Sequence, residues 1–169
     1  MANANESDKT PAELEARVWE LVDKIRFCML TSWDGHRQHQ RPLTAIRDKD
    51  EGDRAVYFLV DEEGSKNWQV ERFPTVALSF ADPGKNEYLT ISGRAELTDD
   101  RKKIKALWSP FAKAWWDSDD DPAIRLLAVY PEEAEIWEGP NRLVAGAIML
   151  AAAATNKRPA VGDHGQVRM

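Results

Sequence analysis

The sequence predicts an α+β protein, mainly β, in which about six antiparallel strands form a small barrel with helices at its periphery. Two segments, 76–80 and 89–97, alternate apolar and polar residues as half-buried strands do. The pair Asp34-Gly35, between two further strand-like segments, is a strong hairpin signal. Strands of this kind, separated by turns and short helices, favour a barrel over a helical bundle.

The first predicted helix begins after Thr10. Thr10 suits the N-cap, Pro11 the first helical position and Glu13 the closing of a capping box. Apolar residues follow at helical spacing, and the helix is expected to end near residue 26. Strands over 27–32 and about 38–47 then flank the Asp-Gly turn.

The remaining elements alternate between strands and short helices. We expect them, in order, at 55–60 (strand), 65–73 (helix), 76–80 and 89–97 (strands), from about 98 (helix), 124–130 and 134–137 (strands) and about 142–154 (helix). A chain of 169 residues can bury a core of its own. We therefore expect one domain over residues 10–154, with a disordered tail over 1–9 and a polar, loosely ordered tail over 155–169.

Composition narrows the possible partners. The net charge of −6 argues against nucleic acid as a main partner. The longest apolar run, 143–154, is shorter than the about 20 residues that a membrane span needs, so no membrane partner is expected. A single cysteine, Cys28, cannot form an internal disulfide, which favours the cytoplasm. The histidines lack the spacing of a metal site, and none is predicted.

Two short segments carry residues that suit a phosphate group. Gly64-Ser65-Lys66 opens a helix directly after a strand, where helix N–H groups, a hydroxyl and an ammonium can converge. Arg41 precedes Pro42, which holds it in extended geometry, and a guanidinium can bind a phosphate through two hydrogen bonds. Alone, the first segment is better explained as an ordinary helix cap. Together the two favour a pocket for a phosphorylated cofactor.

A longer series of motifs points to a family. The chain carries, in order, His39-Gln40-Arg41-Pro42-Leu43-Thr44, Val56-Tyr57-Phe58-Leu59-Val60-Asp61, Ser65-Lys66, and the segments 75–83, 91–97, 105–110 and 131–137. This series resembles the general stress protein branch of the pyridoxamine 5′-phosphate oxidase-like split-barrel flavoproteins. The resemblance runs from about residue 14 to the end and includes the alanine-rich last helix.

The resemblance implies a six-stranded antiparallel split β-barrel (FMN-binding split barrel) that forms a homodimer, with flavin mononucleotide (FMN) at the interface. It assigns the FMN phosphate to three residues: Arg41, Ser65 and Lys66. It places four residues beside the ribityl chain and ring: His39, Pro42, Leu43 and Thr44. It lays backbone groups along the isoalloxazine edge from Phe58, Leu59, Val60 and Asp61. Two tryptophans would approach from the partner subunit: Trp108 and Trp137.

One departure from the family concerns the ring. Val60 stands where relatives often carry threonine, so a side-chain hydrogen bond to the flavin would be absent and backbone contacts would replace it. The chain also lacks the substrate-binding region expected of a true pyridoxamine phosphate oxidase, and that activity is not predicted.

The expected function is an FMN-binding general stress protein that acts as a flavin-dependent oxidoreductase, with flavin N5 as the hydride acceptor and NAD(P)H or another small molecule as the electron donor. The sequence contains no recognised nucleophile motif, and no residue is assigned as a catalytic acid or base. Two alternatives stay open: a flavin-binding sensor or storage module without turnover, and a split barrel that binds haem or the deazaflavin F420.

Overall fold

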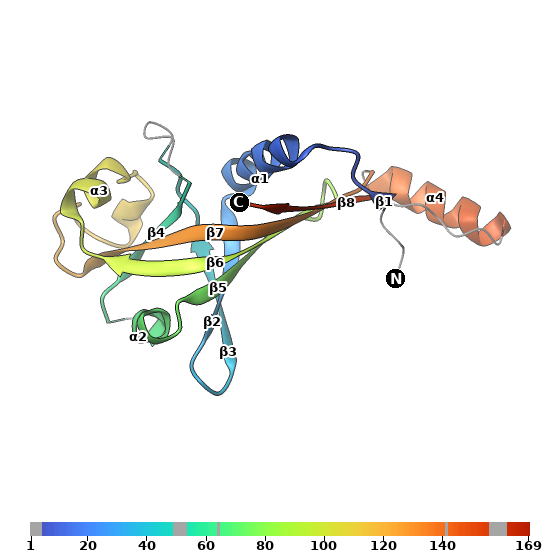
Figure 1. Ribbon diagram of the computed structural model, residues 1–169. Coiled ribbons are helices and arrows are strands. Elements are labelled where there is room, and N and C mark those ends of the chain that lie inside the picture. Colours follow the sequence, from blue (N-terminus) through green and yellow to red (C-terminus); the bar gives the residue numbers. More distant parts are fainter. Residues whose placement is uncertain (1–4, 49–53, 64, 141, 156–161) are drawn as a thin grey trace.

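The computed structural model of the protein describes residues 5–48, 54–63, 65–140, 142–155 and 162–169 (Figure 1). Its strands are β1 (Asn5–Glu6), β2 (Phe27–Trp33), β3 (Gln38–Thr44), β4 (Val56–Asp61), β5 (Thr75–Asp82), β6 (Glu87–Thr98), β7 (Ile124–Glu138) and β8 (Asp163–Arg168). Its helices are α1 (Pro11–Ile25), α2 (Ser65–Arg72), α3 (Arg101–Ala106), α4 (Arg142–Thr155) and a short 3-10 turn at Ala112–Ala114.

Strands β2 to β7 form the predicted six-stranded antiparallel split barrel. Their order is β4-β7-β6-β5-β2-β3, and every neighbouring pair is antiparallel. Within the described residues the two outer strands share no ladder; Ile46, just after β3, forms an isolated bridge with Tyr57 on β4. The barrel is therefore split between β3 and β4.

The first helix forms as its sequence predicts. The Thr10 hydroxyl accepts a hydrogen bond from the Glu13 backbone N–H (3.3 Å), and the Glu13 carboxylate accepts one from the Thr10 backbone N–H (2.8 Å). One face of α1 then packs on the barrel core through four buried residues: Leu14, Val18, Leu21 and Val22. The barrel interior is filled by the alternating apolar residues of the strands, among them Leu30, Leu78, Phe80, Leu89 and Ile91.

β7 is one long strand that changes partners. Its first half, 124–129, pairs with β4, and its second half, 133–138, pairs with β8 along the same edge. The two shorter strands predicted here are thus one continuous strand. At the change of partners, the β6–β7 register shifts between Ser92 and Gly93, and Glu132 of β7 is the extra residue. A Cβ atom on Gly93 would lie 2.2 Å from the Tyr130 carbonyl oxygen, so the close approach of the two strands requires glycine.

The prediction of a loosely ordered C-terminal tail over 155–169 is wrong for its last part. Residues 163–168 form β8, which pairs with β7, and β1 pairs with β8 in parallel, so Asn5–Glu6 is likewise not a disordered tail. The open edge of β7 supplies backbone partners that a polar segment can use without apolar alternation. Gly165 also lets α1 approach, since a Cβ there would lie 2.5 Å from the Leu14 side chain. Residues 1–4 and 156–161 lie outside the described residues.

Helix α4 extends away from the barrel at one end of the molecule (Figure 1). Three of its large apolar side chains are exposed: Val144, Met149 and Leu150. Although residues 143–154 are the longest apolar run of the sequence, the helix is not buried within this chain. None of the described helices is long and apolar enough to cross a membrane.

Candidate functional site

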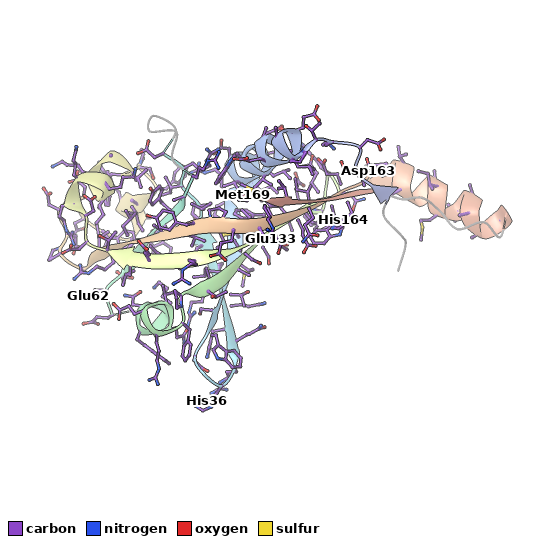
Figure 2. The ribbon with its side chains drawn as sticks, in the orientation of Figure 1. His36, Glu62, Glu133, Asp163, His164 and Met169 are labelled. Carbon is purple, nitrogen blue, oxygen red and sulfur yellow. The ribbon has the colours of Figure 1, made fainter. Side chains whose placement is uncertain are left out.

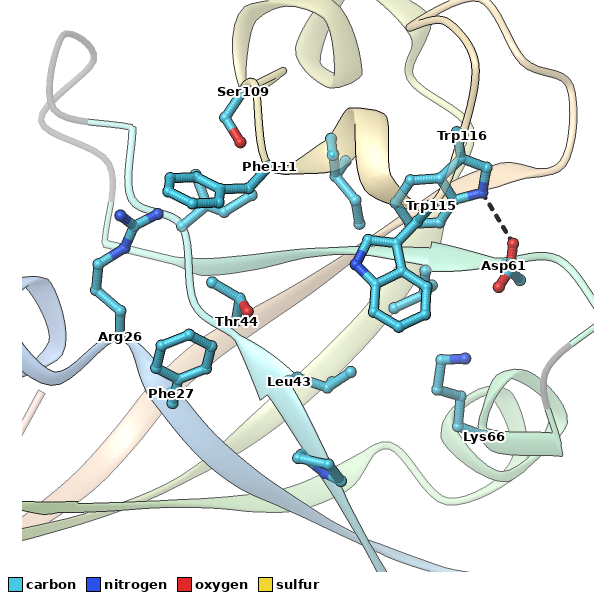
Figure 3. Close-up of a pocket in the computed structure, with 15 residues that line it drawn as sticks. Arg26, Phe27, Leu43, Thr44, Asp61, Lys66, Ser109, Phe111, Trp115 and Trp116 are labelled. Carbon is cyan, nitrogen blue, oxygen red and sulfur yellow. Dashed lines mark hydrogen bonds between the residues drawn. The ribbon is translucent and has the colours of Figure 1, made fainter.

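A cavity of about 450 Å³ opens where the barrel is split (Figure 3). One wall comes from the end of β3 and the residues after it, and includes Pro42, Leu43, Thr44 and Ile46. The facing wall comes from the end of β4 and includes Leu59, Val60 and Asp61. The β2–β3 and β4–β7 ladders both end beside the cavity, so the last residues of β3 and β4 can direct side chains and backbone groups into it.

The cavity brings together seven of the residues singled out in the sequence. They are Pro42, Leu43, Thr44, Leu59, Val60, Asp61 and Lys66. Ser65 opens helix α2 beside them, but its side chain and Gly64 lie outside what the structure describes. Their part in binding a cofactor stays a prediction.

Lys66 and Arg41 make one end of the site positively charged. Burial lowers the pKa of Lys66 below its ordinary value; the positive charge of Arg41 lowers it further, and the Asp61 carboxylate acts in the opposite direction. Burial also lowers the pKa of Arg41. Two partly desolvated cations that repel each other are stabilised by an anion that contacts both. This end of the site is therefore suited to a phosphate group.

Arg41 is anchored from behind and does not itself line the cavity. Its guanidinium donates hydrogen bonds to the Ser32 hydroxyl (2.9 Å) and to the Gln69 amide oxygen (3.0 Å). Both partners are buried, although neither stands out in the sequence as a site residue. Ser32 lies in a strand with an ordinary pattern and Gln69 on a short polar helix, so no local signal marks them.

Two contacts fix the geometry around Asp61. The Trp116 indole N–H donates a hydrogen bond of 2.9 Å to the Asp61 carboxylate, drawn as a dashed line in Figure 3. The Asn67 side-chain amide donates to the Asp61 carbonyl (2.8 Å) and also to that of Glu62. Asn67, in the first turn of α2, is thus tied to the end of β4.

Aromatic side chains surround the mouth of the cavity. Phe27 is 71% exposed, Phe111 73% and Trp115 80%, and all three line the cavity (Figure 3). No motif in the sequence marks these three residues, although the Trp115-Trp116 pair ahead of an acidic loop is a visible signal. Exposed rings of this size are uncommon at a surface that meets only water.

The two tryptophans predicted to approach a flavin do not line this cavity within one chain. Trp108 packs against a second core cluster that includes Tyr57 and Ile104. Trp137 stacks on His164 with ring centroids 5.2 Å apart, at the β7–β8 end of the sheet. Their predicted approach from a partner subunit stays a prediction.

His39 and Phe58 are also absent from the cavity lining. The His39 Nε2 lies 2.6 Å from the Asp34 carboxylate in the β2–β3 hairpin, whose tip Figure 2 marks with His36. The hydrogen bond from His39 lowers the pKa of Asp34, and the backbone N–H groups of Arg37 and His36 add to the effect. Phe58 is buried in the core, so its backbone contact with the flavin ring stays a prediction. No metal-binding group of three or more His, Cys, Asp or Glu occurs among the described residues.

Known proteins resemble this chain over most of its length. General stress protein 26 of Bacillus subtilis (strain 168) is 22% identical over 133 residues, which are 77% of this chain and 92% of that protein. The solved structure of a general stress FMN/FAD binding protein from Xanthomonas citri is 27% identical, with a TM-score of 0.66 over 75% of this chain and 89% of that chain. A Jannaschia sp. CCS1 structure, provisionally described as a general stress protein 26, is 23% identical, with a TM-score of 0.74 over 95% of this chain and 100% of that one.

The family assignment follows from a match along nearly the whole domain. Residues 13–160 match the family model described as "Pyridoxamine 5'-phosphate oxidase like". The split barrel and the relatives named above agree with that match. The chain therefore belongs to the pyridoxamine 5′-phosphate oxidase-like family.

Proposed function

We propose that the protein binds FMN in the cavity at the barrel split and acts as a flavin-dependent oxidoreductase. The observation that carries the proposal is that Lys66 lines one end of the cavity, close enough to Arg41 for their charges to interact, while the other walls are largely apolar and aromatic. The two ends of FMN match the two ends of the cavity, because the molecule carries a phosphate at one end and a flat ring at the other. The volume of about 450 Å³ lies within the range of small-molecule sites.

The chain's residues divide into three roles toward FMN. Arg41, Ser65 and Lys66 would bind the phosphate. The β3 and β4 ends would line the ribityl chain and ring, with backbone groups serving where Val60 offers no hydroxyl. The relative from Xanthomonas citri is described as an FMN/FAD binding protein, which supports a flavin as the ligand of this site.

A bound flavin supplies the redox chemistry, with N5 as the hydride acceptor. The protein supplies orientation and exclusion of water. Lys66 and Arg41 would hold the phosphate end, and Trp116 fixes Asp61. The aromatic rim, formed by Phe27, Phe111 and Trp115, would cover the ring end. NAD(P)H is the electron donor that we propose. A cytoplasmic location stays a prediction from the sequence.

We also propose a homodimer with the site at its interface. The exposed rings of Phe27, Phe111 and Trp115 and the exposed side chains of α4 form two apolar surfaces that water alone would cover in a monomer. A second copy could bury both and bring further residues, such as Trp108 or Trp137, to the cofactor. Sedimentation equilibrium should give the mass of two chains, and a monomer that still binds FMN tightly would contradict the shared site.

The test of function is a visible spectrum of the purified protein, recorded before and after titration with FMN, followed by anaerobic addition of NADPH. We expect flavin bands, saturable binding and bleaching faster than that of free FMN. Binding without faster bleaching would favour a sensor or storage role. A Soret band would favour haem, and a deazaflavin band would favour F420. A colourless protein that gives no FMN binding signal would overturn the proposal.

A further inference from the structure

Ser32, Arg41 and Gln69 form a closed triangle of hydrogen bonds behind the site. The Arg41 guanidinium donates to the Ser32 hydroxyl (2.9 Å) and, through its other terminal nitrogen, to the Gln69 amide oxygen (3.0 Å). The Ser32 hydroxyl in turn donates to the same Gln69 oxygen (2.7 Å). The three residues come from β2, β3 and α2, so the triangle ties three separate elements together.

The direction of every bond in the triangle is determined by chemistry. A guanidinium can only donate, so Gln69 must present its amide oxygen and not its nitrogen. The Ser32 hydroxyl accepts from Arg41 and is left with one hydrogen, which it donates to Gln69. Both Ser32 and Gln69 are 2% exposed, so water does not compete for these bonds. The guanidinium is therefore held in one plane and one orientation.

The two residues that bind Arg41 carry no charge, and this matters as much as their positions. Ser32 and Gln69 are both neutral, so they orient the guanidinium without cancelling its positive charge. Arg41 is close enough to Lys66 for their charges to interact, and Lys66 lines the cavity. A carboxylate at position 69 would satisfy the same hydrogen bonds but would pair with Arg41 as a salt bridge. Such a pair would lower the attraction of this end of the site for an anion.

We propose that Ser32 and Gln69 are positioning residues that orient the Arg41 guanidinium toward the phosphate monoester of a flavin, and that they thereby set the preference for FMN over riboflavin. This inference rests on the proposed FMN site. It assigns to two buried neutral residues a part in ligand specificity, in addition to their part in packing. A purely structural role would affect the binding of both flavins alike.

The experiment compares FMN with riboflavin in the full-length protein, using flavin fluorescence to obtain both dissociation constants. The variants are Gln69→Glu, which keeps size and hydrogen bonding but adds a negative charge, and Ser32→Ala, which removes two of the three bonds, one of them to Arg41. The matched control is Gln38→Glu, the same chemical change at an exposed position of β3. Circular dichroism and thermal melting establish that each variant is folded.

We expect wild-type protein and Gln38→Glu to prefer FMN equally. The preference should fall about 10- to 100-fold in Gln69→Glu, the range of one charge-assisted hydrogen bond, and by a smaller factor in Ser32→Ala. Riboflavin affinity should change little in either variant. If Gln69→Glu does not fold, Ser32→Ala decides the question.

An unchanged FMN-to-riboflavin ratio in the folded variants would overturn the positioning role while leaving the proposed function intact. Wild-type protein that binds neither flavin would overturn the proposed function itself. Wild-type protein that binds both flavins equally would show that the basic end of the cavity does not bind the phosphate. That result would overturn the inference together with the assignment of Arg41 and Lys66 to the phosphate.

Discussion

Lys66→Met is the substitution that tests the basic end of the cavity most directly. Methionine keeps most of the length of the lysine side chain and removes the ammonium. Lys66 is partly buried and lies near Arg41, so its charge is poorly screened by water. Two unit charges about 4 Å apart interact by about 4 kcal/mol at an effective dielectric constant of about 20. Desolvation and competing water reduce the net value to about 1.5–3 kcal/mol for a charge-assisted hydrogen bond.

That loss corresponds to a dissociation constant for FMN about 10 to 100 times higher, with little change for riboflavin. Parallel titrations with the two flavins, at low salt and at high salt, measure both effects. Lys102→Met, at an exposed position of α3, is the control for the loss of a positive charge. An equal loss of affinity for both flavins would indicate a damaged fold. Unchanged FMN affinity would refute the assignment of Lys66 to the phosphate.

Three further outcomes are expected. Gly93→Ala should lower the free energy of unfolding in urea by more than about 2 kcal/mol, because the new Cβ would lie 2.2 Å from the Tyr130 carbonyl oxygen. Gly146→Ala, with open space around it, should not lower it, and equal effects of the two substitutions would contradict this reasoning. Burial raises the pKa of Cys28 to about 12, so iodoacetamide at pH 8 should label the thiol only after unfolding. Mass spectrometry measures the labelling, and rapid labelling of the folded protein would count against a buried thiol. FMN affinity should fall as the pH rises through the lowered pKa of Lys66, because the phosphate needs the protonated amine, whereas riboflavin affinity should not fall. An FMN affinity that does not change between pH 7 and 10, which lies below the ordinary lysine pKa of about 10.4, would argue against the contact.

Local patterns in the sequence predict local structure well here. The Thr10 and Glu13 capping box, the alternating strands and the Asp-Gly hairpin each depend on residues within a few positions of one another, and each forms as expected. Six of the seven predicted residues that line the cavity belong to the ordered motifs at the ends of β3 and β4, and the seventh, Lys66, lies in the first turn of α2. The barrel is split between β3 and β4, the two strands that carry those motifs.

The parts that the sequence does not reveal depend on distant partners. β8 forms because β7 leaves an edge open to it, and its own residues show little apolar alternation. Ser32 and Gln69 become important through Arg41, which is nine positions from one and 28 from the other. The aromatic rim is assembled from Phe27 and from residues after α3, and no spacing rule links the two.

The split in the barrel also provides a way to observe occupancy without a flavin signal. Ile46 and Tyr57 exchange two backbone hydrogen bonds, of 2.9 and 2.8 Å, at the point where β3 and β4 part. Opening an isolated bridge costs far less than unzipping a ladder, so these two amides should exchange with deuterium through local opening and not through global unfolding. A molecule that contacts both walls of the cavity would hold the bridge closed and slow that exchange in proportion to its concentration over its dissociation constant. The amides of Ile46 and Tyr57 are thus internal reporters of whether the cavity is filled.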